Sequence, residues 1–162
     1  MKILGLDPGL RFTGWGLIDS TGNRLKFLSC GRVVVPDNTD LATRLAFLYA
    51  ELSKIITALQ PDQAAVEETF SNVNAKSTLK LGMARGVVML APAQYNIPVS
   101  EYSANTVKKT VVGAGHAGKN QVQHMVKMLL PLAQFANADA ADALAIAICH
   151  AHHAQTMHRI HS

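Results

Sequence analysis

Four acidic residues stand beside apolar runs at three distant places in the chain: Asp7, Glu67, Asp139 and Asp142. Burying an unpaired carboxylate in such surroundings is unfavourable, so each one needs a cation or a hydrogen-bond donor nearby. Carboxylate oxygens are the ligands that magnesium and manganese prefer. Two such ions about 4 Å apart can hold the attacking and the leaving oxygen of a phosphoryl transfer. The residue types therefore indicate metal-dependent phosphoryl transfer, provided that the fold brings the four acids together.

Two of these acids end short apolar runs that predict buried strands. Residues 2–9 are an apolar run that ends in Asp7 and a Pro-Gly turn, which is typical of a buried strand. Residues 64–67 form a second, short apolar run. It ends in Glu67, and a second glutamate, Glu68, follows. An Asp that merely starts a turn is the common alternative for Asp7. If the two strands are adjacent and parallel, the carboxylates emerge at the same edge of the sheet.

The other two acids lie in the last predicted helix. Residues 137–153 are rich in alanine, the best helix former, and Asn137 is a good N-cap. Asp139 and Asp142 are three residues apart and therefore share a face of this helix. Both fall in its first turns, where the helix dipole favours negative charge whatever their function. Because the surrounding residues are apolar, we expect the helix to pack on the sheet and carry both acids inward or to its rim.

The rest of the pattern predicts an α/β fold with a mixed five-stranded sheet. Strands at 13–19 and 26–35 continue the first one as an antiparallel meander, and a fifth strand is predicted at 97–102. Further helices are predicted at 41–59, 75–90, 106–112 and 119–130. The chain shows no internal repeat or linker, so we expect residues 1–162 to form a single domain with helices flanking the sheet.

The composition is that of a globular, mildly basic protein. Of the 162 residues 49% are hydrophobic, and 15 Lys and Arg against 11 Asp and Glu give a net charge of +4, which fits a nucleic-acid partner. Two cysteines without a Cys-x-x-Cys pattern argue against a disulfide framework or a zinc site and favour the cytoplasm. Neither a signal peptide nor a membrane span is predicted.

Seven pieces of the sequence, in order, resemble the RuvC-type Holliday junction resolvases of the ribonuclease-H-like superfamily. They are G-L-D-P-G at 5–9, T-G-W-G at 13–16, V-E-E-T-F at 66–70, L-K-L-G-M-A-R-G at 79–86, K-K-T-V-V-G-A-G at 108–115, K-N-Q-V-Q-H-M at 119–125 and A-D-A-A-D-A-L-A-I-A at 138–147. The resemblance implies a ribonuclease-H-like nuclease fold. It also implies four catalytic, metal-binding acids: Asp7, Glu67, Asp139 and Asp142. Glu67 is preferred to Glu68 because it follows the strand directly.

The resemblance further implies the reaction and its partners. Resolvases of this type are homodimers that bind four-way DNA junctions in homologous recombination and DNA repair. They nick two strands of like polarity and leave 5′-phosphate and 3′-hydroxyl ends. Their cofactor is Mg²⁺, with two ions per active site, and Mn²⁺ can substitute for it. The RuvA–RuvB branch-migration complex is the implied protein partner. Apolar residues at 87–90, beyond the needs of one core, offer an interface for the dimer.

Four basic residues and one aromatic residue are candidates for DNA contact. Lys108, Lys109 and Lys119 flank the glycine-rich loop 113–118, where a phosphate can approach the backbone closely, and Arg85 extends that surface. Solvated surface lysines are the alternative interpretation. The resemblance implies that Phe70 stacks on an unpaired base, with a core position as the equal alternative for a phenylalanine.

Two other functions fit parts of the pattern. An apolar strand followed by D-P-G and T-G also opens ATP-binding proteins of the actin and sugar-kinase type. Those proteins need two such domains and a second phosphate loop, and this chain is too short and shows no second loop. A DNA-structure binder without catalytic activity is the third possibility, and the presence of all four acids argues against it.

Overall fold

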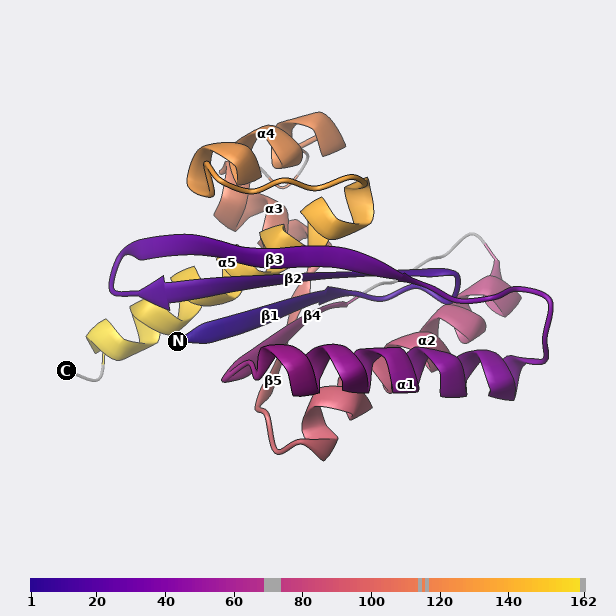
Figure 1. Cartoon of the computed structure of the whole chain (residues 1–162). Helices are drawn as coiled ribbons and strands as arrows, with labels where there is room; N and C mark the ends of the chain where they lie inside the picture. The colour runs from indigo at the N-terminus through magenta and orange to yellow at the C-terminus, as the bar shows by residue number, and fades with distance from the viewer. Residues whose placement is uncertain (69–73, 114, 116, 161–162) are drawn as a thin grey trace.

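The computed structural model describes residues 1–68, 74–113, 115 and 117–160, which form a five-stranded sheet with helices on both faces (Figure 1). The strands are β1 (Lys2–Asp7), β2 (Phe12–Thr21), β3 (Arg24–Val34), β4 (Gln63–Glu68) and β5 (Val99–Ser103). The helices are α1 (Leu41–Leu59), α2 (Ala75–Gln94), α3 (Ala104–Val112), α4 (Lys119–Leu129) and α5 (Ala138–Ile160). The strand order is β3-β2-β1-β4-β5. Strands β1, β2 and β3 are antiparallel, whereas β4 is parallel to β1 and β5, so the predicted mixed sheet is confirmed.

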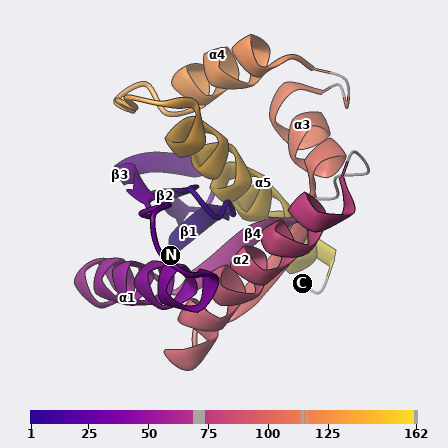
Figure 2. The same ribbon diagram turned by 90° about the vertical axis from the view of Figure 1, so that its right-hand side faces the viewer.

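Each face of the sheet has its own apolar layer (Figure 2). Helices α1 and α2 cover one face, where Leu4, Leu6 and Val66 are buried. Helix α5 crosses the other face, where Ile3 and Ala65 are buried, and α3 and α4 pack against α5. Successive side chains of a strand point to opposite faces, so the alternation along β1 and β4 follows from the strand geometry.

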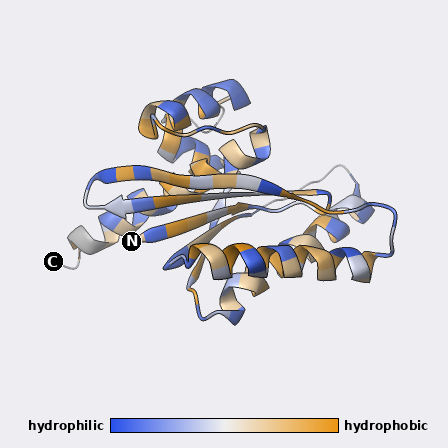
Figure 3. Cartoon of the chain, in the orientation of Figure 1, coloured by the Kyte–Doolittle hydropathy of each residue, from blue (hydrophilic) through white to orange (hydrophobic). Residues whose placement is uncertain are grey.

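Helix α5 lies directly on the sheet because small residues allow the close approach. At Gly5 a Cβ atom would overlap the carbonyl oxygen of Ala143, and at Gly14 it would overlap that of Asp139. Residues 143–149 of this helix are buried. Figure 3 shows apolar and polar residues alternating along α1, the helix in front of the sheet. Among the described residues, no helix is long and apolar enough to cross a membrane.

Most elements begin or end within about two residues of their predicted bounds, and three differences have a clear physical reason. Helix α2 continues to Gln94 with Pro92 inside it, and the burial of Pro92 and Ala91 in the core offsets the hydrogen bond that a proline cannot make. Helix α5 continues to Ile160, beyond the predicted end at 153. Strand β5 starts at Val99 and not at 97, since the Ile97 amide still donates to the Pro92 carbonyl oxygen in the turn after α2.

Candidate active site

The parallel pairing of β1 and β4 brings two of the predicted acids together. Leu6 pairs with Val66, so the next positions, Asp7 and Glu67, end the two strands side by side. Alternation places both on the α5 face of the sheet, because Gly5 and Ala65 contact or line the α5 layer. Glu68 belongs to the opposite face, the one covered by α1 and α2. The geometry thus separates two adjacent glutamates that the sequence alone left hard to distinguish.

The start of α5 brings the other two acids to the same edge. Asn137 caps this helix by accepting a hydrogen bond from the Ala140 amide at 2.9 Å. The Asp139 backbone lies on Gly14, and Gly14 is paired with Asp7 across β1 and β2. Asp142, one turn further along α5, interacts electrostatically with Asp7 and Glu67. The structure therefore gathers the four predicted acids from three distant segments.

Burial and mutual repulsion shift the protonation of these acids. Burial and then the neighbouring Glu67, Asp142 and Asp139 raise the pKa of Asp7 to about 8. Burial, with Asp142 second, raises the pKa of Glu67 above its ordinary value, although a hydrogen bond from Asp7 opposes the shift. Burial also raises the pKa of Asp142. Such clustered carboxyl groups favour a cation among them, because a cation removes both the repulsion and the need for protons.

The donor set fits a hard divalent cation. All four side chains offer carboxylate oxygens, which suit Mg²⁺ or Mn²⁺ better than softer metals. Within the described part of the chain no three His, Cys, Asp or Glu side chains lie close enough together to enclose an ion as they stand. The acids are neighbours that repel one another, so we expect them to draw inward when a cation binds.

Two of the predicted DNA-binding lysines lie next to the acids. Lys119 is the exposed first residue of α4. Its positive charge partly offsets the rise in the pKa of Asp7 and of Asp142. Lys108 on α3 does the same for Glu67 and Asp142. Lys109 lies differently, because its aliphatic stem packs along Gly115. Lys108 and Lys119 thus form a positive border of the acidic edge.

Arg85, a further predicted DNA contact, is bound within the protein. The Arg85 guanidinium forms an ion pair with Glu101, and its Nε donates to the Glu67 carbonyl oxygen at 3.4 Å. These bonds tie α2 to the end of β4 and to the middle of β5, and the contact of Arg85 with DNA stays a prediction. Phe70 lies outside the described residues.

Sequence reasoning missed two side chains around the site. Arg32 of β3 places Nη1 at 3.3 Å from Oδ2 of Asp139, a contact that depends on strand register and leaves no signal in the sequence. His150 of α5 is buried, with Nε2 at 2.6 Å from Oε1 of Gln63 and Nδ1 at 2.8 Å from the Tyr102 hydroxyl. His150 therefore ties α5 to β4 and β5. Burial, with His153 second, lowers its pKa.

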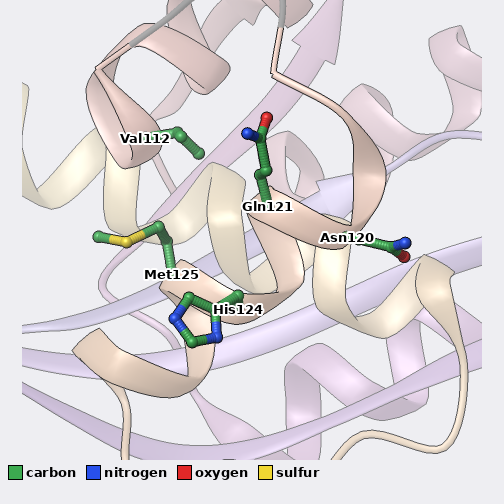
Figure 4. A pocket seen from close by; sticks show the side chains of 5 residues that line it. All are labelled: Val112, Asn120, Gln121, His124 and Met125. Carbon is green, nitrogen blue, oxygen red and sulfur yellow. The ribbon is translucent and has the colours of Figure 1, made fainter.

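A hollow between α3 and α4 is separate from the acids. Figure 4 shows the side chains that line it: Val112, Asn120, Gln121, His124 and Met125. Its lining is mostly apolar and contains no carboxylate, so we assign it no part in the chemistry.

Comparisons with known proteins identify the family of this chain. A family model described as "Crossover junction endodeoxyribonuclease RuvC" matches residues 3–150. A crossover junction endodeoxyribonuclease RuvC of Rhodopseudomonas palustris is 61% identical over 153 residues, which cover 94% of this chain and 88% of that protein. The Thermus thermophilus RuvC structure has a TM-score of 0.87 at 30% identity and covers 97% of both chains. RuvC of the same organism in complex with Holliday junction substrate has a TM-score of 0.90 at 31% identity, over 97% of this chain and 96% of that one.

Proposed function

Since this chain belongs to the RuvC family of crossover junction endodeoxyribonucleases, we propose that it resolves four-way DNA junctions in homologous recombination and repair. The chain has the ribonuclease-H-like fold of that family. The observation that carries the proposal is the meeting of Asp7, Glu67, Asp139 and Asp142 at one edge of the sheet. Each active site cuts one strand and leaves a 5′-phosphate and a 3′-hydroxyl end.

The four acids are proposed as the ligands of two Mg²⁺ ions, with Mn²⁺ as an effective substitute. Bound there, divalent cations would activate a water molecule and stabilise the charge on the leaving oxygen. Asp7 would hold an ion in its deprotonated form, because a cation would offset both the burial and the repulsion that raise its pKa. His150 and Asn137 have a supporting part, because they fix α5 against the sheet and fix its first turn.

Lys108 and Lys119 are proposed to bind DNA phosphates beside the scissile bond. Their charges already act on the acids, so a phosphate held by them would lie at the metal site. Lys109 and Phe70 are proposed as further DNA contacts, with Phe70 stacking on an unpaired base. We leave Arg85 out of this set because its guanidinium is bound to Glu101 and β4.

A homodimer is proposed, with α2 as its interface. One face of this helix is apolar and exposed: Leu79 (62% exposed), Met83 (39%) and Leu90 (48%) follow a helical spacing. Gly82 and Gly86 lie on the same face with no neighbouring atom around a Cβ position, so a second helix can approach closely. Within the stretch at 87–90, Val88 is buried in the protein's own core and is not available for this contact.

The RuvA–RuvB branch-migration complex is proposed as the partner that presents the junction, and the cytoplasm as the compartment. Both rest on family membership. Nothing in the described residues favours a second function over junction cleavage.

Nick mapping on a labelled four-way junction and a matched linear duplex tests the proposal, with Mg²⁺ or EDTA. We expect paired nicks near the junction centre with Mg²⁺, none with EDTA, and little cutting of the duplex. Binding of the junction without nicks under any metal would mean a structural DNA binder. Equal cutting of the duplex would mean a general nuclease.

A further inference from the structure

Arg32 of β3 lies in the same row of the sheet as Asp7. The strand register pairs Arg32 with Gly14, and Gly14 with Asp7. Residues paired across neighbouring strands project to the same face of a sheet, here the face on which Asp139 stands over Gly14. Arg32 and Asp7 therefore flank the first turn of α5 from two sides.

Two contacts fix the position of the Arg32 guanidinium. Its Nη1 lies 3.3 Å from Oδ2 of Asp139, and its central carbon lies 4.3 Å from the centre of the Phe12 ring. A guanidinium can stack through its flat face and donate hydrogen bonds from its edge at the same time. Phe12 thus sets the plane of the group, and the edge meets the carboxylate. A carboxylate held through Oδ2 still offers Oδ1 to a cation.

We propose that Arg32 is a positioning residue that orients the Asp139 carboxylate for a metal ion. The proposal rests on the proposed function, because it takes Asp139 as a metal ligand. The Asp139 side chain is 32% exposed, so without Arg32 it is free to turn toward solvent. Hydrogen-bonding partners of metal ligands typically contribute about 10–100-fold to metal affinity. An ion pair this exposed contributes little to folding, so the effects on metal binding and on stability are separable.

Mn²⁺ binding to the DNA-free protein, measured from the electron paramagnetic resonance signal of the free ion, tests this role. We expect Arg32→Gln to raise the Mn²⁺ dissociation constant about tenfold or more with little change in thermal unfolding. Arg32→Lys, which keeps the charge but loses the planar fork, should lie between Arg32→Gln and the wild type. Arg11→Gln is the matched control, because Arg11 lies 5.3 Å from the same ring and pairs with Asp37 at 4.0 Å. We expect it to bind Mn²⁺ as the wild type does.

The opposite results each overturn the role of Arg32. An unchanged dissociation constant in Arg32→Gln would mean that Asp139 needs no support. A lower one would mean that Arg32 competes with the ion for Asp139. Arg32→Gln could instead weaken junction binding in EDTA and reduce the slope of log affinity against log salt by about one. With the Mn²⁺ affinity unchanged, that result would mean that Arg32 contacts a DNA phosphate.

Asp142→Asn in the same measurement distinguishes this inference from the proposed function. If Asp142→Asn loses Mn²⁺ while Arg32→Gln keeps it, only the role of Arg32 is wrong. If Asp142→Asn binds Mn²⁺ as well as the wild type, the ion does not occupy the acidic edge, and the proposed metal site fails together with the role of Arg32.

Discussion

Asp7 and Glu67 end two adjacent parallel strands, and their carboxyl groups lie close enough to shift each other's pKa. Burial and then the neighbouring acids raise the pKa of Asp7 to about 8, so this carboxyl group keeps a proton near neutral pH. In the metal-free protein a proton thus supplies the positive charge that a divalent cation would otherwise provide.

Replacing Asp7 by asparagine should separate catalysis from DNA binding. The amide of the new side chain can still donate a hydrogen bond to Glu67, so the fold should persist, but a metal ligand is lost. We expect nicking to fall roughly 1000-fold or more, as the loss of several kcal/mol of transition-state stabilisation implies. Junction binding, measured by gel shift in EDTA, should stay near that of the wild type. Loss of binding together with cleavage would instead make Asp7 structural.

Glu67 and Glu68 form a matched pair, because they are neighbours that point to opposite faces of β4. We expect Glu67→Gln to reduce nicking strongly. Glu68→Gln should stay within about twofold of the wild type, as substitutions away from a site do. Rates on a four-way junction at saturating Mg²⁺ compare the two. Equal losses of nicking rate in the two variants would show that Glu68, on the other face of β4, also takes part in catalysis.

The stability of the metal-free protein should depend on the ionisation of Asp7. Its pKa is 3.8 ordinarily and about 8 in the folded chain, so between these values the folded state keeps a proton that the unfolded state releases. Unfolding therefore becomes easier as the pH rises from about 4 to about 8, by at most about 1.4 kcal/mol per pH unit from this group.

Thermal unfolding in EDTA at several pH values between about 5 and 8 measures this effect. We expect Asp7→Asn to lose less stability than the wild type as the pH increases. The difference between its melting temperature and that of the wild type should therefore grow in its favour. Asp37→Asn, a change of an exposed aspartate on the surface, should follow the wild type throughout. If all three proteins respond alike, Asp7 does not carry the proton.

Most of the fold could be predicted from local pattern. The apolar runs of β1 and β4 and the alanine-rich stretch of α5 each indicated their element, because hydrophobic periodicity and helix propensity are local properties. The end of α5 was predicted too early, at 153 and not at Ile160, since its histidine-rich residues have no periodic signal. Ala154 and Gln155 are half-buried, and the Gln155 amide donates a hydrogen bond to the Gly22 carbonyl oxygen, which holds this end against the turn between β2 and β3.

The site was predictable only as a set of residue types. Asp7 and Glu67 meet because β1 and β4 are parallel neighbours. The sequence predicted both strands but not that they pair. The Arg32–Asp139 contact joins residues 107 positions apart and requires the exact register of three strands. The Arg85–Glu101 ion pair was also not predictable, because a cation near a basic loop and a cation paired with an acid on another element look the same in a sequence.

Lys108 and Lys119 should differ from Lys109 in DNA binding. The first two act electrostatically on the acids, while the Lys109 stem packs on Gly115. We expect Lys108→Ala and Lys119→Ala each to weaken junction binding and to flatten the slope of log affinity against log salt by about one. Lys109→Ala should change that slope less. Equal slopes in all variants would place the three lysines away from the phosphates.

Junction resolution should require two active subunits. A four-way junction separates into two duplexes only after two opposed strands are cut, and each subunit has a single set of acids: Asp7, Glu67, Asp139 and Asp142. A two-fold dimer on a two-fold junction is the simplest arrangement that meets this need. A mixed dimer with one wild-type and one Asp7→Asn subunit should therefore nick one strand and stop.

The mixed dimer can be purified with two different affinity tags and tested on a junction extruded in a small circular plasmid. We expect nicked circles from the mixed dimer and linear product from the wild-type dimer within one binding event. Leu79→Glu, on the exposed face of α2, should lower the dimer fraction in analytical ultracentrifugation and reduce linear product, because a charge buried in an interface is unfavourable. Linear product from the mixed dimer at the wild-type rate would show that one site serves both strands, and the symmetric mechanism would be wrong.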